Sequence, residues 1–520
     1  MKKQLSTLAI FCAALGAMAQ TITNDWHLKY SPKDTVYGID LYGALKDIPK
    51  PATAKSVIVA VIDNGVDIKH PDLSTNIWTN TFEIPGNSVD DDHNGYIDDI
   101  HGWDFLGNVS GDIRYDNLEM TRKLRELRKK YEGKSSKEIA KSDKAEYKSY
   151  LALEKTFDIE YKEIEKNYIF FNTMHDQQST LLREMGKKEP SYKELEAFEP
   201  NSPEAKLARS NTLKYCAGGM IEPKVIFTEV NNLIKHFEAQ YKYHYNLKFD
   251  PRPFVGDDYL DPKNNKYGNN EVAGPEPDHG SHVGGIIGAV RDNNLGMDGI
   301  CPLVQLMVLR VVPDGDERDK DVALAIRYAV DNGAKVINMS FGKSYAFNKA
   351  AVDEAVKYAE SKDVLIIHAA GNDGKDLESN NNFPSPFYTD GSNCKTWIEV
   401  GASNIDQAPA SFSNYGRKTV NVFAPGVQIY STTPDSNYQR FDGTSMASPV
   451  VAGVAALIRA YYPNLTAVQV KQAIESTVIK PTKKFKKPGS RRKKTKYKKL
   501  CTTAGVVNAA AALKAASLMK

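Results

Sequence analysis

The sequence has few cysteines and no excess of either charge, and both absences narrow what the protein can be. Only 5 of its 520 residues are cysteine, and the four that follow the N-terminal segment are too scattered for a zinc site. In an oxidising compartment these four could form two disulfides, with three possible pairings. They are Cys216, Cys301, Cys394 and Cys501. Lys and Arg number 68 against 65 Asp and Glu, so the bulk charge indicates no affinity for nucleic acid.

Long apolar segments are also scarce, and the one at the N-terminus has the features of an export signal. Lys2 and Lys3 precede an apolar stretch that is too short to span a bilayer and that ends in Ala17-Met18-Ala19. This pattern predicts a secretory signal peptide over residues 1–19 and a secreted or periplasmic protein, with a buried N-terminal helix as the alternative. No other segment is apolar enough to predict a membrane helix.

Four continuously apolar, β-branched runs alternate with amphipathic helical patterns. They are Ser56–Asp63, Val304–Val312, Ala334–Ser340 and Asp363–Gly371. Such runs are typical of parallel strands buried on both faces. The alternation predicts an α/β fold with a doubly wound, mostly parallel sheet and helices on both faces. Functional groups are then expected at the carboxyl ends of the strands.

A lysine- and glutamate-rich stretch over residues 117–250 interrupts this pattern. Its tyrosines and leucines recur at helical spacing, as in "EYKSYLALEKTFDIEYKEIEKNYIFF". We expect a mainly helical insertion whose apolar positions pack as a helical hairpin rather than bind a cofactor. The α/β domain therefore falls into two parts, 56–116 and 251–520, after an N-terminal extension over 20–55.

The segment Lys480–Lys499 is densely basic and is broken by prolines. Two interpretations are open. The favoured one is a solvated, mobile loop, which is the usual state of a charge run. The other is docking to an anionic surface such as lipid headgroups, glycans or nucleic acid.

Three polar residues stand where a strand ends or a helix begins. Asp63 ends "VIVAVID", His279 opens "HGSHVGGIIGAV", and Ser445 precedes the apolar run "MASPVVAGVAALI". Taken singly they read as a turn, a helix start and a helix N-cap. Taken together they supply a carboxylate to orient an imidazole, an imidazole to accept a proton and a hydroxyl to attack.

Five motifs in this order resemble the subtilisin-like serine peptidases, or subtilases: "VIDNGVDIKHPDL", "HGSHVGGIIGA", "VINMSFG", "AAGND" and "GTSMASP". The resemblance implies that Ser445 is the nucleophile, His279 the general base and Asp63 its orienting partner. It also implies that Asn372 donates to the oxyanion together with the backbone N–H of Ser445. Asn64 stands where the family usually has Ser or Thr beside the catalytic carboxylate, and we expect its amide N–H to bind that carboxylate instead.

By the same resemblance, two segments wall the pocket for the residue before the cut bond, and their edges would pair with an extended peptide. They are Ser340, Phe341 and Gly342, and Ala369, Ala370 and Gly371. Their glycines leave a roomy apolar slot, which predicts a preference for large apolar side chains. Asp373 near the rim would instead favour a basic residue.

The segment "DDDHNGYIDD" places oxygen ligands at alternating positions, like the start of an EF-hand loop. The candidate ligands are Asp90, Asp92, Asn94 and Asp98. The closing glutamate of such a loop is missing, because the twelfth position is His101. Structural calcium is therefore expected here, with an acidic turn as the alternative, and no organic cofactor is indicated.

These observations predict a secreted serine endopeptidase that acts on polypeptides. One alternative is an exopeptidase or dedicated processing peptidase whose cleft is capped by the insertion. The other is a catalytically inactive binding protein of the same fold. No nucleic-acid partner is expected.

Overall fold

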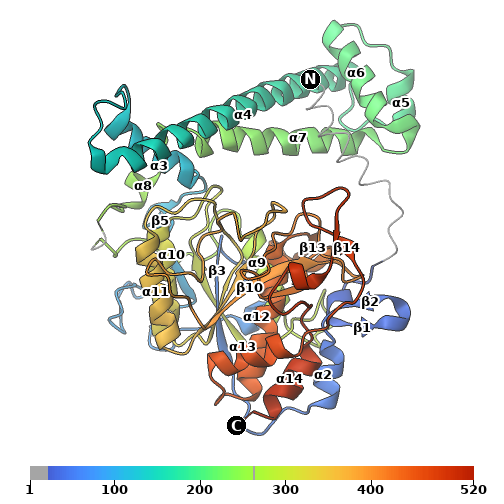
Figure 1. Ribbon diagram of the computed structural model, residues 1–520. Helices are drawn as coiled ribbons and strands as arrows, with labels where there is room; N and C mark the ends of the chain where they lie inside the picture. The colour runs from blue at the N-terminus through green and yellow to red at the C-terminus, as the bar shows by residue number, and fades with distance from the viewer. Residues whose placement is uncertain (1–21, 262–263, 520) are drawn as a thin grey trace. The chain divides into compact units, whose positions relative to one another are not determined.

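A computed structural model describes residues 22–261 and 264–519 (Figure 1). The predicted signal peptide lies outside the described residues. The chain forms two compact units: Met120–Phe249 make up a helical unit, while Thr23–Glu119 and the chain from Asp250 onward make up an α/β unit.

The α/β unit is built on a seven-stranded sheet in which every neighbouring pair is parallel. The strand order is β11-β10-β9-β8-β3-β7-β4. Their bounds are β3 Val57–Asp63, β4 Gly102–Asp104, β7 Val304–Arg310, β8 Val336–Met339, β9 Leu365–Ala369, β10 Trp397–Ser403 and β11 Val422–Pro425. The four predicted strands are β3, β7, β8 and β9, so the predicted doubly wound sheet is confirmed. After β7 the chain crosses to the other side of β3, which makes the carboxyl ends of β3 and β8 the expected position for a site.

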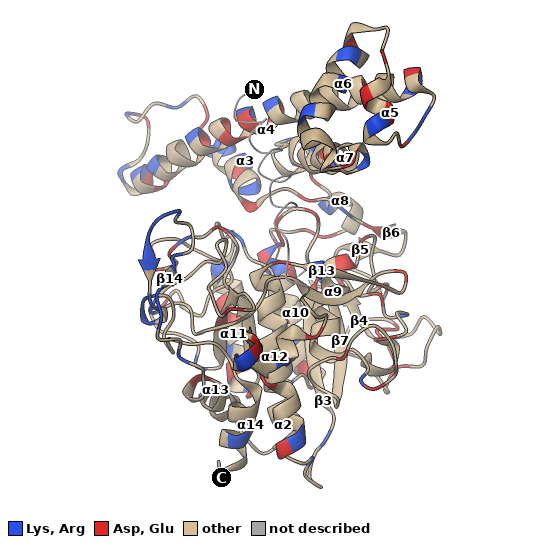
Figure 2. Ribbon diagram, turned by 90° about the vertical axis from the view of Figure 1, so that its right-hand side faces the viewer, with Lys and Arg blue, Asp and Glu red and all other residues tan. Residues whose placement is uncertain are grey.

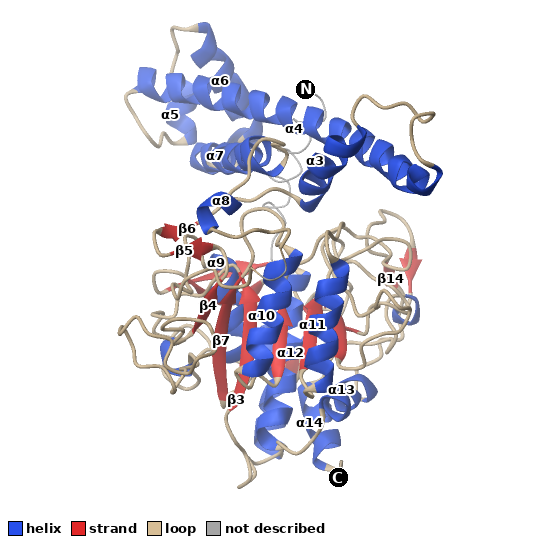
Figure 3. Ribbon diagram, turned by 90° about the vertical axis from the view of Figure 1, so that its left-hand side faces the viewer, coloured by secondary structure: helices blue, strands red, loops and turns tan. Residues whose placement is uncertain are grey.

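Helices cover both faces of the sheet. Helices α10 (Asp319–Asp331) and α11 (Lys349–Ser361) pack on one face, and α9 (Asp278–Gly288) and α12 (Thr444–Tyr461) pack on the other (Figures 1 and 3). The remaining helices of this unit are α2 Leu41–Asp47, α8 Arg252–Val255, α13 Ala467–Ser476 and α14 Ala509–Ser517. The core between α10, α11 and the strands is apolar, with residues such as Ile62, Leu309 and Ile326 fully buried.

By length and composition alone, helix α12 could cross a membrane. The amino-acid sequence had predicted no such segment outside the N-terminus. In the structure 94% of its 18 residues are buried inside the protein. Its apolar character therefore belongs to the core of the α/β unit.

The N-terminal extension is an integral part of the α/β unit. Trp26 is fully buried and donates its indole N–H to the carbonyl oxygen of Gln428, at 3.2 Å. The backbone N–H of Ala509 binds the carbonyl oxygen of Ile39, at 2.6 Å. A small antiparallel pair, β1 (Tyr30–Ser31) with β2 (Val36–Tyr37), lies between these anchors.

Three further antiparallel pairs lie outside the main sheet. They are β5 (Gly107–Asn108) with β6 (Gly111–Asp112), β12 (Ile429–Thr433) with β13 (Asn437–Phe441), and β14 (Phe485–Lys486) with β15 (Lys494–Thr495). The last pair falls within the basic segment. The prediction for Lys480–Lys499 did not include this pairing: Phe485 and Tyr497 bury their rings in the core, while most of the lysines and arginines of the segment are exposed.

The helical unit confirms the predicted helical insertion. Its helices are α3 Glu119–Tyr131, which begins at the end of the α/β unit, α4 Lys144–Met185, α5 Tyr192–Ala197, α6 Pro203–Tyr215 and α7 Pro223–Ala239. The 42-residue helix α4 packs against α6 and α7. Two apolar clusters form along it, one around Met174 and Ile226 and one around Leu181 and Leu195.

The four cysteines outside the N-terminal segment are buried, and none of them forms a disulfide in the described part of the chain. Burial raises the pKa of Cys301 to about 12 and that of Cys501 to about 11. Thiols of such high pKa are poor nucleophiles at neutral pH, which leaves them a packing role.

Candidate active site

Asp63 and His279 meet at the carboxyl edge of the sheet. Asp63 is the last residue of β3 and His279 is the second residue of α9. The approach is close because a side chain at Gly280 would lie 2.1 Å from the carbonyl oxygen of Gly65. As a result, Nδ1 of His279 lies 2.7 Å from Oδ1 of the buried Asp63 carboxylate. This contact fixes the orientation of the imidazole. It leaves Nε2, the other ring nitrogen, to contact a substrate or the nucleophile.

Asn64 binds the Asp63 carboxylate differently from the prediction. Its backbone N–H donates to Oδ1 of Asp63, at 2.8 Å. Its side-chain amide instead donates to the carbonyl oxygen of Glu276, at 2.7 Å, and accepts from the N–H of Gly280, at 2.8 Å. The expected side-chain bond to the carboxylate is therefore wrong, because the longer Asn side chain reaches past Asp63 and caps the start of α9.

Two carboxylates control the charge of His279. Withdrawal from solvent lowers the pKa of this imidazole, whereas Asp63, in contact with it, and Asp278, the preceding residue, raise it. The carboxylates dominate, so the pKa of His279 lies above its ordinary value of 6.5. The ring is one-third exposed, with 32% of its side-chain area accessible, and can reach a substrate.

Ser445 is the second residue of α12 and lies at the opening of that helix. At this position its backbone N–H has no carbonyl one turn earlier to bind, as is general for the first turn of a helix. The Ser445 hydroxyl donates to the carbonyl oxygen of Ser340, at 2.9 Å, and the Ser340 hydroxyl donates to the carbonyl oxygen of Ser445, also at 2.9 Å. Among the described residues no hydrogen bond joins Ser445 to His279.

Asn372 lies beside the opening of α12 with its amide oriented by Thr444. Oδ1 of Asn372 accepts from the backbone N–H of Thr444, at 2.9 Å, and from its hydroxyl, at 3.0 Å. The same hydroxyl also accepts from the N–H of Gly371, at 3.0 Å. Because the amide oxygen is engaged, the Nδ2 group is the end of Asn372 that is available to another molecule.

A cavity of about 300 Å³ adjoins the Asp63–His279 pair. Ser340 and Phe341 line it together with the side chains of Arg114 and Glu276, which form an ion pair at 2.7 Å. Sequence reasoning missed this pair, because Arg114 lies just before the helical insertion and Glu276 just before α9, so that no local pattern joins them.

The two predicted wall segments follow adjacent strands, β8 and β9, and a side chain that was not predicted lies between them. A Cβ atom on Gly342 would lie 2.4 Å from Oδ1 of Asn382, and one on Gly371 would lie 3.7 Å from the same atom. Asn382 is held there by its Nδ2 bond to the carbonyl oxygen of Ala369, at 3.0 Å. Behind it, Glu399 is buried and accepts from the Trp397 indole, at 2.8 Å. Asn382 belongs to a polar run, "SNNNFPSP", that offers no signal of such a position.

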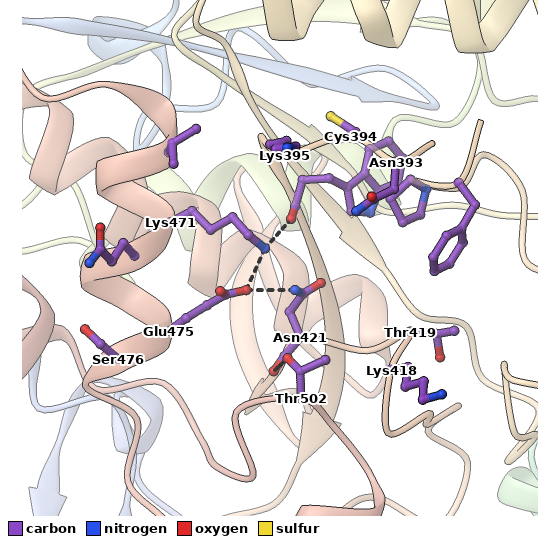
Figure 4. A pocket seen from close by; sticks show the side chains of 15 residues that line it. Asn393, Cys394, Lys395, Lys418, Thr419, Asn421, Lys471, Glu475, Ser476 and Thr502 are labelled. Carbon is purple, nitrogen blue, oxygen red and sulfur yellow. Dashed lines mark hydrogen bonds and ion pairs between the residues drawn. The ribbon is translucent and has the colours of Figure 1, made fainter. Parts of the chain in front are cut away.

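A larger cavity, about 760 Å³, lies elsewhere, and its lining includes none of Asp63, His279, Asn372 and Ser445. Its central polar groups bind one another (Figure 4). Nζ of Lys471 donates to Oε1 of Glu475, at 2.6 Å, and to the carbonyl oxygen of Trp397, at 2.7 Å. Nδ2 of Asn421 donates to the same carboxylate, at 2.7 Å. Lys471 and Glu475 neutralise each other, and the lining contains no histidine to act as a base, so the smaller cavity beside His279 is the better candidate for chemistry.

The predicted calcium ligands are only partly brought together. Asp90 and Asp92 lie near Glu83, and one carboxylate oxygen from each of the three lies within 4.8 Å of the others. The Asp98 carboxylate instead accepts backbone N–H groups from Gly86, Asn87 and Ser88, at 2.8–3.3 Å. Asn94, the remaining predicted ligand, donates from Nδ2 to the carboxylates of Asp92 and Asp99. Glu83 was not predicted, because it precedes the EF-hand-like spacing by seven residues and shares no pattern with it.

A parallel α/β sheet with an Asp–His pair at its carboxyl edge and a serine at the opening of a helix is the architecture of a serine hydrolase. The chain belongs to the subtilase family, whose model matches residues 54–502. It is therefore a subtilisin-like serine peptidase, and its substrates are polypeptides.

Three relatives illustrate the match. Subtilisin DY of Bacillus licheniformis is 38% identical over 38% of this chain and 69% of its own length. Thermitase of Thermoactinomyces vulgaris is 38% identical over 39% of this chain and 67% of its own length. The cell wall-associated protease of Bacillus subtilis (strain 168) is 38% identical over 41% of this chain and 22% of its own length.

Proposed function

We propose that the protein is an endopeptidase in which Ser445 is the nucleophile, His279 the general base and Asp63 the group that orients His279. The observation that carries this proposal is the 2.7 Å contact between Asp63 and His279 at the strand edge that also holds Ser445 through Ser340. In this proposal the Ser445 hydroxyl exchanges its bond to the Ser340 carbonyl for a bond to Nε2 of His279 when substrate enters. Catalytic hydrogen bonds often form only when substrate is bound.

In this mechanism His279 accepts the Ser445 proton as Oγ attacks the peptide carbonyl carbon, and then donates that proton to the leaving amine. The Asp63 carboxylate stabilises the imidazolium between these steps. Water then attacks the acyl-enzyme by the same route, again with His279 as the base.

Labelling by a fluorophosphonate tests the nucleophile: wild type should react, and Ser445→Ala should not. Labelling that persists in the variant would contradict the assignment.

The oxyanion is stabilised by Nδ2 of Asn372 and by the backbone N–H of Ser445. Support comes from Thr444, which engages the amide oxygen of Asn372 and so leaves its nitrogen as the donor toward a substrate. The positive end of the α12 dipole acts in the same direction. In subtilisin itself, loss of the corresponding side-chain donor costs about 10²–10³ in turnover, and that magnitude is taken from subtilisin rather than from this structure.

The substrate is bound as an extended strand along Ser340–Gly342 and Ala369–Gly371, with a preference for large apolar residues before the cut bond. Asn382 between Gly342 and Gly371 limits the depth of the slot. We therefore expect leucine and methionine to be preferred over phenylalanine and tyrosine.

Replacing Asn382 with glycine is expected to deepen the slot. The ratio of kcat/KM for a phenylalanine peptide to that for a leucine peptide should rise about tenfold, since a few added methylene-sized contacts are worth about 1–3 kcal/mol. Matched peptides that differ only before the cut bond measure this ratio. Asn381→Gly, at the exposed neighbouring position, is the control. A ratio that moves equally in both variants would remove Asn382 from the pocket.

The pH dependence follows from the raised pKa of His279. Only the neutral imidazole accepts the serine proton, so kcat/KM should fall as the pH drops through a value above 6.5. Asp278→Asn removes a charge that raises this pKa, so the acidic limb should move to lower pH while the activity at high pH is kept. Asp406→Asn, an exposed carboxylate elsewhere, should leave the limb in place. A limb that does not move, or moves upward, contradicts the assignment of His279 as base.

We propose structural calcium at Glu83, Asp90 and Asp92, a set of hard oxygen donors that suits this ion. Asn94 and Asp98 would support the loop. Chelation should lower Tm, because an ion that binds only the folded state at 100 times its Kd adds about 2.7 kcal/mol. Glu83→Gln should abolish the calcium-dependent part of Tm, whereas the exposed Asp47→Asn should retain it. Unchanged Tm and activity on chelation would exclude the site.

Export is proposed from the N-terminal residues 1–19, whose composition is that of a signal peptide. N-terminal sequencing of the protein from cell fractions tests this: a mature chain that begins near Gln20 outside the cytoplasm is expected, and an intact Met1 would contradict it.

A further inference from the structure

The basic segment Lys480–Lys499 forms a defined surface, because buried side chains hold it in place. In the β14–β15 pair, Phe485 faces Thr495 and Lys486 faces Lys494. The residues that point inward are buried: the Tyr497 ring meets Phe423 and Phe485 at 5.2 and 5.7 Å, and its hydroxyl donates to the carbonyl oxygen of Gln407, at 2.7 Å. The lysines alternate with these anchors and point outward, so the hairpin holds its charges on one fixed face. We name residues 480–499 the basic hairpin.

The outward face carries a high density of positive charge, seen as the blue strand β14 and its loop in Figure 2. Eleven side chains are exposed: Lys480, Lys483, Lys484, Lys486, Arg491, Arg492, Lys493, Lys494, Lys496, Lys498 and Lys499. The hairpin contains no acidic residue. In the described part of the chain none of the eleven forms an ion pair, whereas many lysines elsewhere do. Such a cluster repels itself, and a polyanion bound to it would relieve that repulsion.

The turn of the basic hairpin lies against the loop that carries Asn372. The backbone N–H of Gly489 binds the carbonyl oxygen of Ser411, at 2.9 Å. A Cβ atom on Gly374 would lie 2.7 Å from the Cα of Gly489, so the two glycines are in backbone contact. Asn414 holds the same loop by accepting the N–H groups of Asp373 and Lys375. Gly374 is only two residues from Asn372, a span of at most about 7.6 Å between Cα atoms.

The turn of the basic hairpin at Gly489 therefore lies close to Asn372, the proposed oxyanion donor. The distance corresponds to about three residues of extended chain. We therefore expect a polypeptide in the cleft to contact both at once. The exposed face also lacks apolar side chains, because the aromatic residues of the hairpin are the buried anchors. Membrane-surface segments usually add exposed Trp, Phe or Leu, and single-stranded nucleic acid is usually stacked on exposed aromatic rings. These features favour an acidic polypeptide over a lipid surface or a nucleic acid.

We propose that the basic hairpin is an exosite that recruits polypeptide substrates carrying an acidic segment about three to six residues from the bond to be cut. The inference rests on the proposed function and adds a substrate class to it. Its charge attracts the acidic segment, raises the rate of encounter and holds the chain across the cleft.

The test uses fluorogenic peptides with one neutral core and a leucine before the cut bond. A run of four Glu or four Gln is placed three residues from that bond, on either side in separate peptides. Wild type should cleave one Glu peptide about tenfold faster in kcat/KM than its Gln partner at low salt. The ratio should fall toward one as salt is added, because surface charges are screened beyond about 10 Å at 0.1 M.

The hairpin variant replaces outward lysines and keeps the buried anchors: Lys486→Gln, Lys493→Gln, Lys494→Gln and Lys496→Gln. The control makes the same change of charge at exposed lysines elsewhere in the α/β unit: Lys33→Gln, Lys46→Gln, Lys50→Gln and Lys514→Gln. The Glu-over-Gln ratio should approach one in the hairpin variant and persist in the control. A ratio of one in wild type, or an equal loss in both variants, overturns the proposal.

Binding separates this inference from the proposed function. In the Ser445→Ala background, fluorescence anisotropy should show tighter binding of the Glu peptide than of the Gln peptide, and the hairpin variant should remove the difference. This result is independent of whether Ser445 is the nucleophile. If wild type instead binds anionic phosphatidylglycerol vesicles or duplex DNA but does not distinguish the two peptides, the exosite proposal is wrong and the surface serves that other partner.

Discussion

Replacing Ser445 with alanine is expected to lower kcat by about 10⁶-fold, the magnitude known for nucleophile loss in subtilisin itself rather than one obtained from this structure. The change removes the hydroxyl that is proposed to give its proton to Nε2 of His279. The residual rate should come from peptide binding and from the oxyanion donors, Asn372 and the backbone N–H at position 445. Hydrolysis of a fluorogenic peptide, followed over hours for the variant, measures the difference.

Residues that act as one catalytic unit give non-additive losses. His279→Ala alone should therefore cost nearly as much as Ser445→Ala, and the double variant should be no slower than either single variant. Additive losses would mean that the two side chains act separately, which contradicts the proposed proton transfer.

A matched control lies one turn along the same helix. The Ser448 hydroxyl donates to Oδ1 of Asn338, at 2.8 Å, and Ser448 is fully buried. Ser448→Ala should keep kcat and lose about 1 kcal/mol of stability, the usual net value of a hydrogen bond. Equal loss of activity in Ser445→Ala and Ser448→Ala would indicate a disturbed helix rather than a missing nucleophile.

The central strands and the convergence of the proposed catalytic groups were accessible from sequence for one physical reason. Strands buried on both faces require continuous apolar runs, and parallel strands place their carboxyl ends on a single edge. Asp63 at the end of β3 and Ser340 directly after β8 are consequently neighbours, although their residue numbers differ by 277. The same reasoning could not find the edge strand β4, whose three residues are too short for a pattern.

Contacts between loops could not be predicted from the sequence in this way. Glu83 and Asn382 belong to irregular polar segments, and their neighbours are set by how distant loops fold rather than by a periodic pattern. The basic hairpin was not predicted for another reason. Buried and exposed residues do alternate along it, but the many lysines hide this alternation in the sequence. Phe485 and Tyr497 are the signal, since an aromatic residue in a solvated charge run has no reason to be there.

Lys343 links the substrate-binding edge to a buried cluster of charges, and this gives the second large prediction. Its side chain is 1% exposed. Nζ contacts Oε2 of Glu119 at 2.7 Å, Oδ1 of Asp319 at 2.6 Å and the carbonyl oxygen of Glu317 at 2.6 Å. Burial lowers the pKa of Lys343, but the facing carboxylates raise it by more, so the amine stays charged.

The backbone of Lys343 continues the wall segment Ser340–Gly342. Its N–H and carbonyl group pair with Phe383, at 3.0 and 2.8 Å. Glu119 is the residue at which the chain leaves the α/β unit. One ammonium group therefore joins three parts of the α/β unit: the backbone after Gly342, Asp319 at the start of α10, and Glu119.

Lys343→Met is expected to lower the free energy of unfolding of the α/β unit by about 3–5 kcal/mol, because it leaves buried carboxylates without their cation. Urea unfolding in the Ser445→Ala background, which avoids self-digestion, measures the loss. Lys335→Met, at an exposed lysine in the same unit, should change stability by no more than about 0.5 kcal/mol.

A second variant separates lost charge from lost packing. Adding Glu119→Gln to Lys343→Met removes one of the two carboxylates that faced the lost ammonium group and should restore part of the stability, since a buried ion cluster is costly mainly when it is broken unevenly. No recovery would indicate that the methylene chain of Lys343, rather than its ammonium group, does the stabilising. A Lys343→Met loss as small as that of Lys335→Met would show that the buried cluster does not depend on this cation.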